Sequence, residues 1–148
     1  MGVSTDGLLM YGYDLGGGDG PWKLDGLSEY DEFERPWINE DDGIFESAKK
    51  TLLAAAGFTE TDYNVDGYFD RKRAAEAQVG VHFEGYCSDA YTAYVISART
   101  ITASRGDCLL VDFTIDPAWN EKLAHALKVL DLKPTQAEPR WLLASYWG

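Results

Sequence analysis

Carboxylate and amide side chains at alternate positions open the stretch DYNVDGYFDRKR, and they match the first half of an EF-hand calcium loop. Asp62, Asn64 and Asp66 stand where such a loop places its first three ligands. The twelfth position of the loop requires a glutamate that supplies both carboxylate oxygens, and here it is Arg73. Positive charge therefore stands where the closing ligand should be. We predict side-chain turns over this stretch and no metal ion.

The glycine run at 16–20 has the composition of a phosphate-binding loop. A phosphate loop continues through Gly-Lys-Ser/Thr into a helix, whereas this run continues into Pro21 and Trp22. The carboxylate of Asp19 would also repel a phosphate. We therefore predict a flexible connection here and no cofactor.

Histidine and cysteine are the other residue types that could do chemistry. His82 and Cys87 lie five positions apart on one expected strand, so they point to opposite faces, and Cys87 is expected in the core. Cys108 and His125 lie elsewhere, and the four residues have no spacing typical of a zinc site. Neither thiol catalysis nor metal binding is predicted.

One face of the same expected strand carries His82, Glu84 and Tyr86, the only plausible acid–base group in the chain. Ser97 and Arg99 are expected on the next strand, beside this group. A small hydrolase-type enzyme that uses His82 and Glu84 is therefore an alternative function. No activated nucleophile accompanies the pair, and cross-strand pairing on a solvated sheet face explains the same pattern. We predict no catalytic residue.

The chain has 148 residues and a net charge of −12, and 45% of its residues are hydrophobic. This length and composition predict a single domain, 1–148, with a substantial core. The negative charge argues against direct nucleic-acid binding and against anionic membranes, which both require clustered Lys and Arg. No segment has the roughly 20 apolar residues of a membrane helix or the pattern of a signal peptide. With only two cysteines, a cytoplasmic location is expected.

The negative charge is concentrated at the start of the chain. Residues 1–46 contain 12 acidic residues against two basic ones, a net charge of −10, whereas residues 47–148 contain 13 against 11, a net charge of −2. The same N-terminal segment is rich in aromatic residues. Rigid aromatic side chains beside carboxylates are typical of a surface that docks a basic protein partner. The predicted partner-binding residues are Tyr30, Asp31, Glu32, Phe33, Glu34 and Trp37.

Two further possibilities remain open for this segment. Its carboxylates could imitate the phosphates of DNA and so inhibit a nucleic-acid-binding protein, although Gly and Trp interrupt them. A homodimer is also possible. Solubility and a supply of core aromatics would explain the composition without any contact function.

The hydrophobic periodicity predicts an α+β fold, with an antiparallel sheet of about four to five strands and two to three helices packed on one face. Residues 1–46 form the acidic, aromatic-rich segment and residues 47–148 the α+β core. Strands are expected at 8–15, 79–87, 91–104 (with a possible bulge), 108–115 and 140–147. Helices are expected from Asp41 or Asp42 to Ala56, over 70–77, and from Asp116 to Leu130.

Several strings in the chain are distinctive: YGYDLGG, GFTE, VGVHFEGYCSD, SRGD and WLLASYWG. They resemble a family of small acidic uncharacterised proteins found in actinobacteria and their phages, and the similarity runs over nearly the whole chain. The resemblance implies a setting, a phage accessory gene whose product binds a host or phage protein. It carries over no catalytic residue, ligand or cofactor. The expected function is therefore that of a non-enzymatic accessory protein that acts by protein binding.

Overall fold

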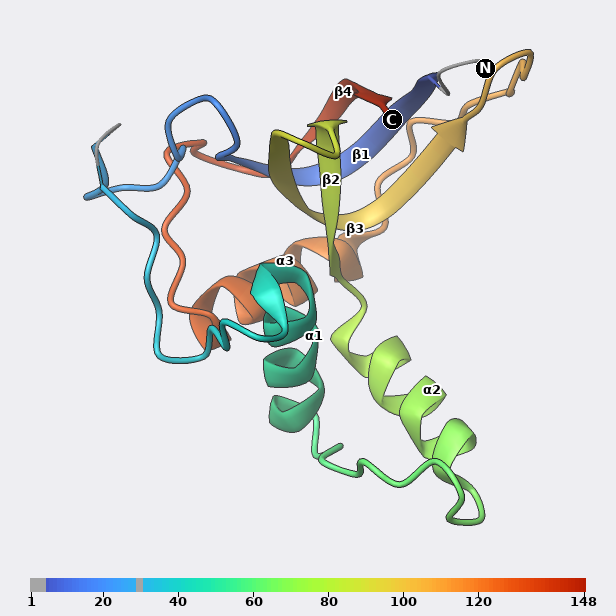
Figure 1. Cartoon of the computed structure of the whole chain (residues 1–148). Coiled ribbons are helices and arrows are strands. Elements are labelled where there is room, and N and C mark those ends of the chain that lie inside the picture. The colour runs from blue at the N-terminus through green and yellow to red at the C-terminus, as the bar shows by residue number, and fades with distance from the viewer. Residues whose placement is uncertain (1–4, 29–30) are drawn as a thin grey trace.

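Figure 1 shows the computed structural model of the chain, which describes residues 5–28 and 31–148. Within these residues there are four strands and three helices. The strands are β1 (Thr5–Gly16), β2 (His82–Ser88), β3 (Thr92–Ala103) and β4 (Arg140–Trp147). The helices are α1 (Gly43–Ala55), α2 (Tyr68–Val79) and α3 (Pro117–Val129). The predicted α+β class is confirmed.

The four strands form one sheet in the order β1-β3-β2-β4, which closes on itself. β1 pairs antiparallel with β3 and with β4, and β2 pairs antiparallel with β3. The closing contact joins β2 to β4 in parallel, through Cys87 with Tyr146 and Ser88 with Trp147. The prediction of a purely antiparallel sheet is therefore wrong. Closure brings together two strands that run in the same direction, and no local pattern encodes that long-range meeting.

The long strand β3 contains the bulge that the sequence predicts. Tyr11 of β1 faces Arg99, but the next residue, Gly12, faces Ser97, so Ala98 has no partner in the ladder. The buried hydroxyl of Ser97 donates to the Arg99 carbonyl oxygen at 2.7 Å. The extra residue bends β3 and increases its twist. β3 pairs with β1 over nearly its whole length and with β2 through its first half, so residues 94–97 pair with both neighbours.

The strand predicted over 108–115 does not form. The Ser104–Asp107 turn is present, with the Asp107 amide donating to the Ser104 carbonyl at 2.9 Å, but residues 107–116 then run to α3 without helix, strand or turn. Alternating apolar residues indicate that a segment could lie on a pleated sheet, but a strand forms only where a neighbouring strand offers a free edge for hydrogen bonding. The prediction is wrong because the alternation does not report whether such an edge is present. Asp112, within this stretch, consequently lies on no strand.

Helices α1 and α3 begin and end close to their predicted limits. Gly57 follows α1 with a φ of 87°, which only glycine adopts readily, and buried Phe58 folds back with its amide on the Leu53 carbonyl at 2.9 Å. Asp116 caps α3 by accepting from the Ala118 amide at 2.9 Å. Helix α2 is longer than predicted and includes Val79, so β2 begins three residues later than expected.

The main core lies where the sheet meets α1 and α3. Apolar residues of β1 and β3 pack there with Leu52 of α1 and Leu123 of α3. Helix α2 instead packs on α1, where Ala75 contacts a small cluster with Leu53 and Phe58. In Figure 1 α2 extends away from the sheet beside α1. Among the described residues, no helix is both long and apolar enough to cross a membrane.

Candidate functional site

The aromatic residues of the acidic segment hold its backbone on the core. The Phe33 ring lies between those of Trp22 and Trp37, with centroids 4.7 and 6.0 Å away. The Trp37 indole N–H donates to the Leu130 carbonyl oxygen at the end of α3, at 2.8 Å. Phe33 and Trp37 are partly buried against the main core. The third predicted aromatic contact, Tyr30, lies outside the described residues.

The predicted acidic residues point to solvent. Asp31, Glu32 and Glu34 are exposed. Asp31 accepts from the Ser28 amide at 2.7 Å, which closes a local turn. The carboxylates of Glu32 and Glu34 have no ion-pair partner among the described residues. Two predicted side chains are thus free to pair with an external cation.

A shallow depression of about 570 Å³ lies beside these carboxylates. Pro36 and Ile38 supply apolar surface to it, and Glu32, Glu34 and Glu40 surround it with negative charge. The one basic side chain at its edge, Arg35, donates to two backbone carbonyl oxygens, that of Asp131 at 3.0 Å and that of Glu34 at 2.8 Å. We call residues 31–40 the acidic loop. Its chemistry suits a cationic group carried on an apolar stem.

The proposed acid–base pair is present, and the two hydroxyl groups expected beside it have other hydrogen-bond partners. His82 Nε2 lies 2.5 Å from Glu84 Oε1. The Ser97 hydroxyl is committed to the Arg99 carbonyl, and Tyr86 donates its hydroxyl proton to Asp14 at 2.8 Å. Burial and this hydrogen bond raise the pKa of Tyr86 above its usual value. The residues expected to share a site therefore serve separate structural contacts.

Glu84 makes a testable contribution to stability. Burial alone would raise its pKa, but the hydrogen bonds from His82 and Thr100 outweigh that effect and hold the pKa below its ordinary value. A carboxyl group with a lowered folded-state pKa stabilises the protein above its unfolded pKa, about 4.3 for glutamate, and this stabilisation is lost as the pH falls through the folded value. Glu84→Gln should therefore flatten the fall in urea midpoint between about pH 5 and pH 3. An equal fall in urea midpoint for Glu84→Gln and for the parent chain over this pH range would contradict the expectation.

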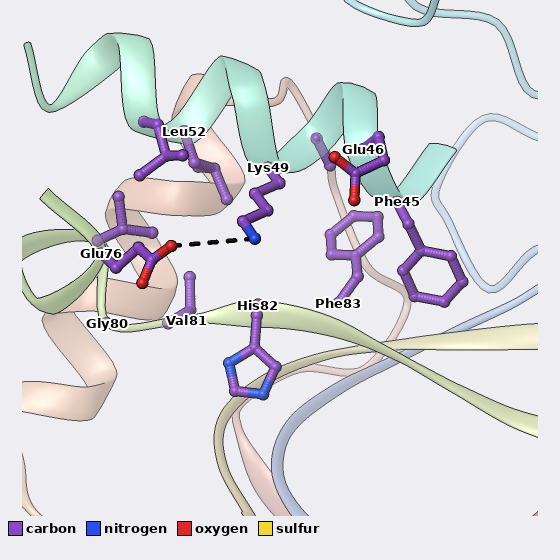
Figure 2. A pocket seen from close by; sticks show the side chains of 12 residues that line it. Phe45, Glu46, Lys49, Leu52, Glu76, Gly80, Val81, His82 and Phe83 are labelled. Atoms are coloured by element: carbon purple, nitrogen blue, oxygen red, sulfur yellow. Dashed lines mark ion pairs between the residues drawn. The ribbon is translucent and has the colours of Figure 1, made fainter. Parts of the chain in front are cut away.

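A cavity of about 550 Å³ lies between α1, the end of α2 and the start of β2 (Figure 2). Its walls are mainly apolar, and Lys49 crosses it towards Glu76, with Nζ and Oε1 3.9 Å apart. Figure 2 shows the His82 ring turned away from α1, on the other side of β2 from Lys49. His82 also lines this cavity at the start of β2, but its ring does not face the Lys49 side chain in Figure 2.

No family model, curated protein or solved structure matches the chain. The resemblance to small proteins of actinobacteria and their phages stays a prediction. What the molecule does is therefore inferred from its own contacts.

The stretch that resembles a calcium loop is held by an arginine. Asn64 donates its amide to the Asp62 carboxylate at 2.9 Å, which is the predicted side-chain turn. The Arg71 guanidinium reaches both oxygens of Glu60 at 2.6 Å and the Asp66 carbonyl at 2.9 Å. In the described part of the chain, no three His, Cys, Asp or Glu residues are grouped to hold a metal ion.

Sequence reasoning missed the role of Asp14, which holds the glycine-rich turn that follows β1. Its carboxylate accepts from the Gly16 amide at 3.0 Å, from Lys23 at 2.6 Å and from Tyr86 at 2.8 Å. These bonds tie the glycine-rich turn to β1 and β2. In the sequence, Asp14 stands out only as an aspartate before a glycine run. Its role could not be predicted because Lys23 and Tyr86 are distant from it in sequence.

Proposed function

We propose that the protein acts by binding a basic protein partner through the acidic loop. The observation that supports this most is the pair of exposed, unpaired carboxylates of Glu32 and Glu34 on a loop whose aromatic residues are packed on the core. A loop that is already ordered loses little conformational entropy on binding. Carboxylates at the edge of an interface speed association with a positive partner and select it by charge.

The partner surface that fits best presents Lys or Arg next to an apolar side chain. Its cations pair with Glu32, Glu34 and Glu40, and its apolar group enters the depression at Pro36 and Ile38. The outer parts of Phe33 and Trp37 remain proposed contacts, together with Tyr30. In the setting that the resemblance implies, the partner is a host or phage protein in the cytoplasm.

The two other functions gain less support from the geometry. The carboxylates of the acidic loop lie on irregular backbone, which does not repeat at the spacing of DNA phosphates. A hydrolase would need a nucleophile that His82 can deprotonate, and the Ser97 hydroxyl is buried and bonded to a backbone carbonyl. Protein binding requires neither feature.

A charge-swap experiment tests the proposal. The variant Glu32→Lys/Glu34→Lys should reduce recovery of a specific partner about tenfold, because losing two ion pairs costs roughly 1.4 kcal/mol. The measurement is affinity purification from actinobacterial lysate, with the recovered proteins quantified by mass spectrometry. The variant should keep the circular dichroism spectrum of the parent chain.

A matched control separates the acidic loop from net charge. Asp66→Lys/Glu121→Lys changes two exposed acids elsewhere and alters the total charge by the same amount. It should recover the partner as the parent chain does. Equal losses in both variants, or no loss in the loop variant, would remove the proposal.

A further inference from the structure

The cavity between α1, the end of α2 and the start of β2 has the size of a small-molecule site. Its volume of about 550 Å³ lies within the roughly 300–1,000 Å³ that is typical of such sites. In Figure 2 α1 lies above the cavity, the end of α2 closes one side and β2 runs below it. A small molecule in this cavity would therefore be enclosed by three elements of the chain.

The apolar lining comes from all three elements. Leu52 and Phe45 belong to α1, Val79 ends α2, and Val81 and Phe83 lie at the start of β2. Figure 2 shows Leu52 and Val81 towards one end of the cavity and Phe45 towards the other. The rings of Phe45 and Phe83 meet edge to face, with centroids 6.5 Å apart. The cavity therefore has an aliphatic end and an aromatic end.

The charged groups that line the cavity are one positive charge short. Glu46 and Glu76 both line it, and among the described residues Lys49 is the one lysine or arginine that does. Lys49 Nζ lies 3.9 Å from Glu76 Oε1, which is beyond hydrogen-bonding distance. Figure 2 shows Lys49 and Glu46 both directed from α1 into the cavity. One loosely held lysine thus faces two carboxylates.

The neighbouring basic groups do not supply the missing charge. Lys50, the next residue on α1, pairs with Asp42 at 2.8 Å, and His82 pairs with Glu84. The carboxyl end of α2 also lies at the cavity, because Val79 lines it, and the carbonyl groups at a helix end carry partial negative charge. The potential in the cavity therefore favours a cation over an anion.

Lys49 has a second carboxylate within reach on its own helix. Glu46 precedes it by three residues, the spacing at which helical side chains meet and opposite charges pair. When a ligand cation pairs with Glu76, Lys49 can turn to Glu46, so that each carboxylate has one cation. An anionic ligand would instead have to share Lys49 with two carboxylates.

We propose that this cavity binds a small organic cation, an ammonium group carried on an aromatic or other apolar body. The ammonium pairs with Glu76, and the body lies along the cavity towards the rings of Phe45 and Phe83, where aromatic contact favours an aromatic body. Residues 31–40 do not line the cavity, so this site is separate from the acidic loop.

Calorimetric titration with three matched probes tests the charge preference. At pH 7 and 0.15 M salt, 2-phenylethylammonium should bind with a Kd of about 1 mM or lower. The neutral 2-phenylethanol and the anionic 3-phenylpropionate have bodies of similar size and should each bind at least about fivefold more weakly. Equal affinity for the ammonium and the alcohol would show an apolar pocket without charge selection.

Two substitutions in the cavity should act in opposite directions. Glu76→Gln should weaken binding of 2-phenylethylammonium about fivefold, because the ligand loses its carboxylate. Lys49→Gln should strengthen binding about threefold, because the internal cation no longer competes for Glu76. Asp66→Asn removes one exposed carboxylate outside the cavity and should bind the probe as the parent chain does. Each variant should keep the circular dichroism spectrum of the parent chain.

Three outcomes would overturn the proposal. They are no binding of 2-phenylethylammonium up to 10 mM, equal affinity for the ammonium and the alcohol, and weaker binding in Lys49→Gln than in the parent chain. The last is the result that an anion site would give. Glu32→Lys/Glu34→Lys should bind the probe like the parent chain, since 0.15 M salt screens distant exposed charges. Loss of partner recovery and loss of probe binding are therefore separate results.

Discussion

Gly12→Ala is expected to destabilise the protein by about 3 kcal/mol or more, because the site has no room for a methyl group. A Cβ atom built on Gly12 would lie 1.8 Å from the Ile96 carbonyl oxygen, which is a backbone atom and cannot rotate away. Relief would require β1 and β3 to separate at the bulge. The measurement is the free energy of unfolding in urea.

Gly7→Ala is the matched control on the same strand. A Cβ atom there would meet its nearest neighbour, the Ala103 carbonyl oxygen, at 3.8 Å, an ordinary contact. Its free energy of unfolding should stay within about 1 kcal/mol of the parent value. Equal stability of the two variants would show that the bulge is not packed as described.

Trp37→Ala is expected to cost about 3 kcal/mol, near the lower end of the range for aromatic residues lost from a core. The substitution removes packing against Phe33 and leaves the Leu130 carbonyl without its indole donor. The acidic loop should then be released from the core. Urea unfolding measures the first effect, and faster proteolytic cleavage within residues 31–40 measures the second.

Trp37→Phe separates packing from hydrogen bonding. The phenyl ring keeps most of the contact but lacks the N–H group, so the expected cost is about 1 kcal/mol. The acidic loop should stay resistant to protease. If Trp37→Ala left stability and cleavage unchanged, Trp37 would not anchor the loop, and its role would lie in contact alone.

The helices could be predicted from the sequence because their signals are local. Asp116 and Pro117 mark the start of α3, and Gly57 marks the end of α1, all within one turn of the helix that each delimits. The strands β1, β3 and β4 were also found from short-range alternation. The bulge in β3 followed from a run too long for one regular strand.

The features that sequence reasoning missed depend on distant contacts. Cys87 was expected in the core by alternation, but it is exposed, with a φ of 76°, at the point where β2 meets β4. The segment 108–115 has the composition of a strand but pairs with none of the four strands in the described residues. Both outcomes depend on how the sheet closes. The periodicity of the sequence does not predict that closure.

The candidate site was predicted in part. The exposure of Asp31, Glu32 and Glu34 agrees with the expected solvent-facing carboxylates. Phe33 and Trp37 pack on the core and therefore have a structural role. The sequence alone could not distinguish this role from a role in docking a partner. The depression at Pro36 and Ile38 was not foreseen, because it arises from the path of the loop.

Hydrogen–deuterium exchange on the chain, with and without the recovered partner, tests the central claim most directly. Binding through the acidic loop predicts slower amide exchange within residues 31–40, with exchange in α2 unchanged. The protection should disappear with Glu32→Lys/Glu34→Lys. Protection confined to α2 or to the cavity beneath α1, with none at residues 31–40, would contradict the proposed function.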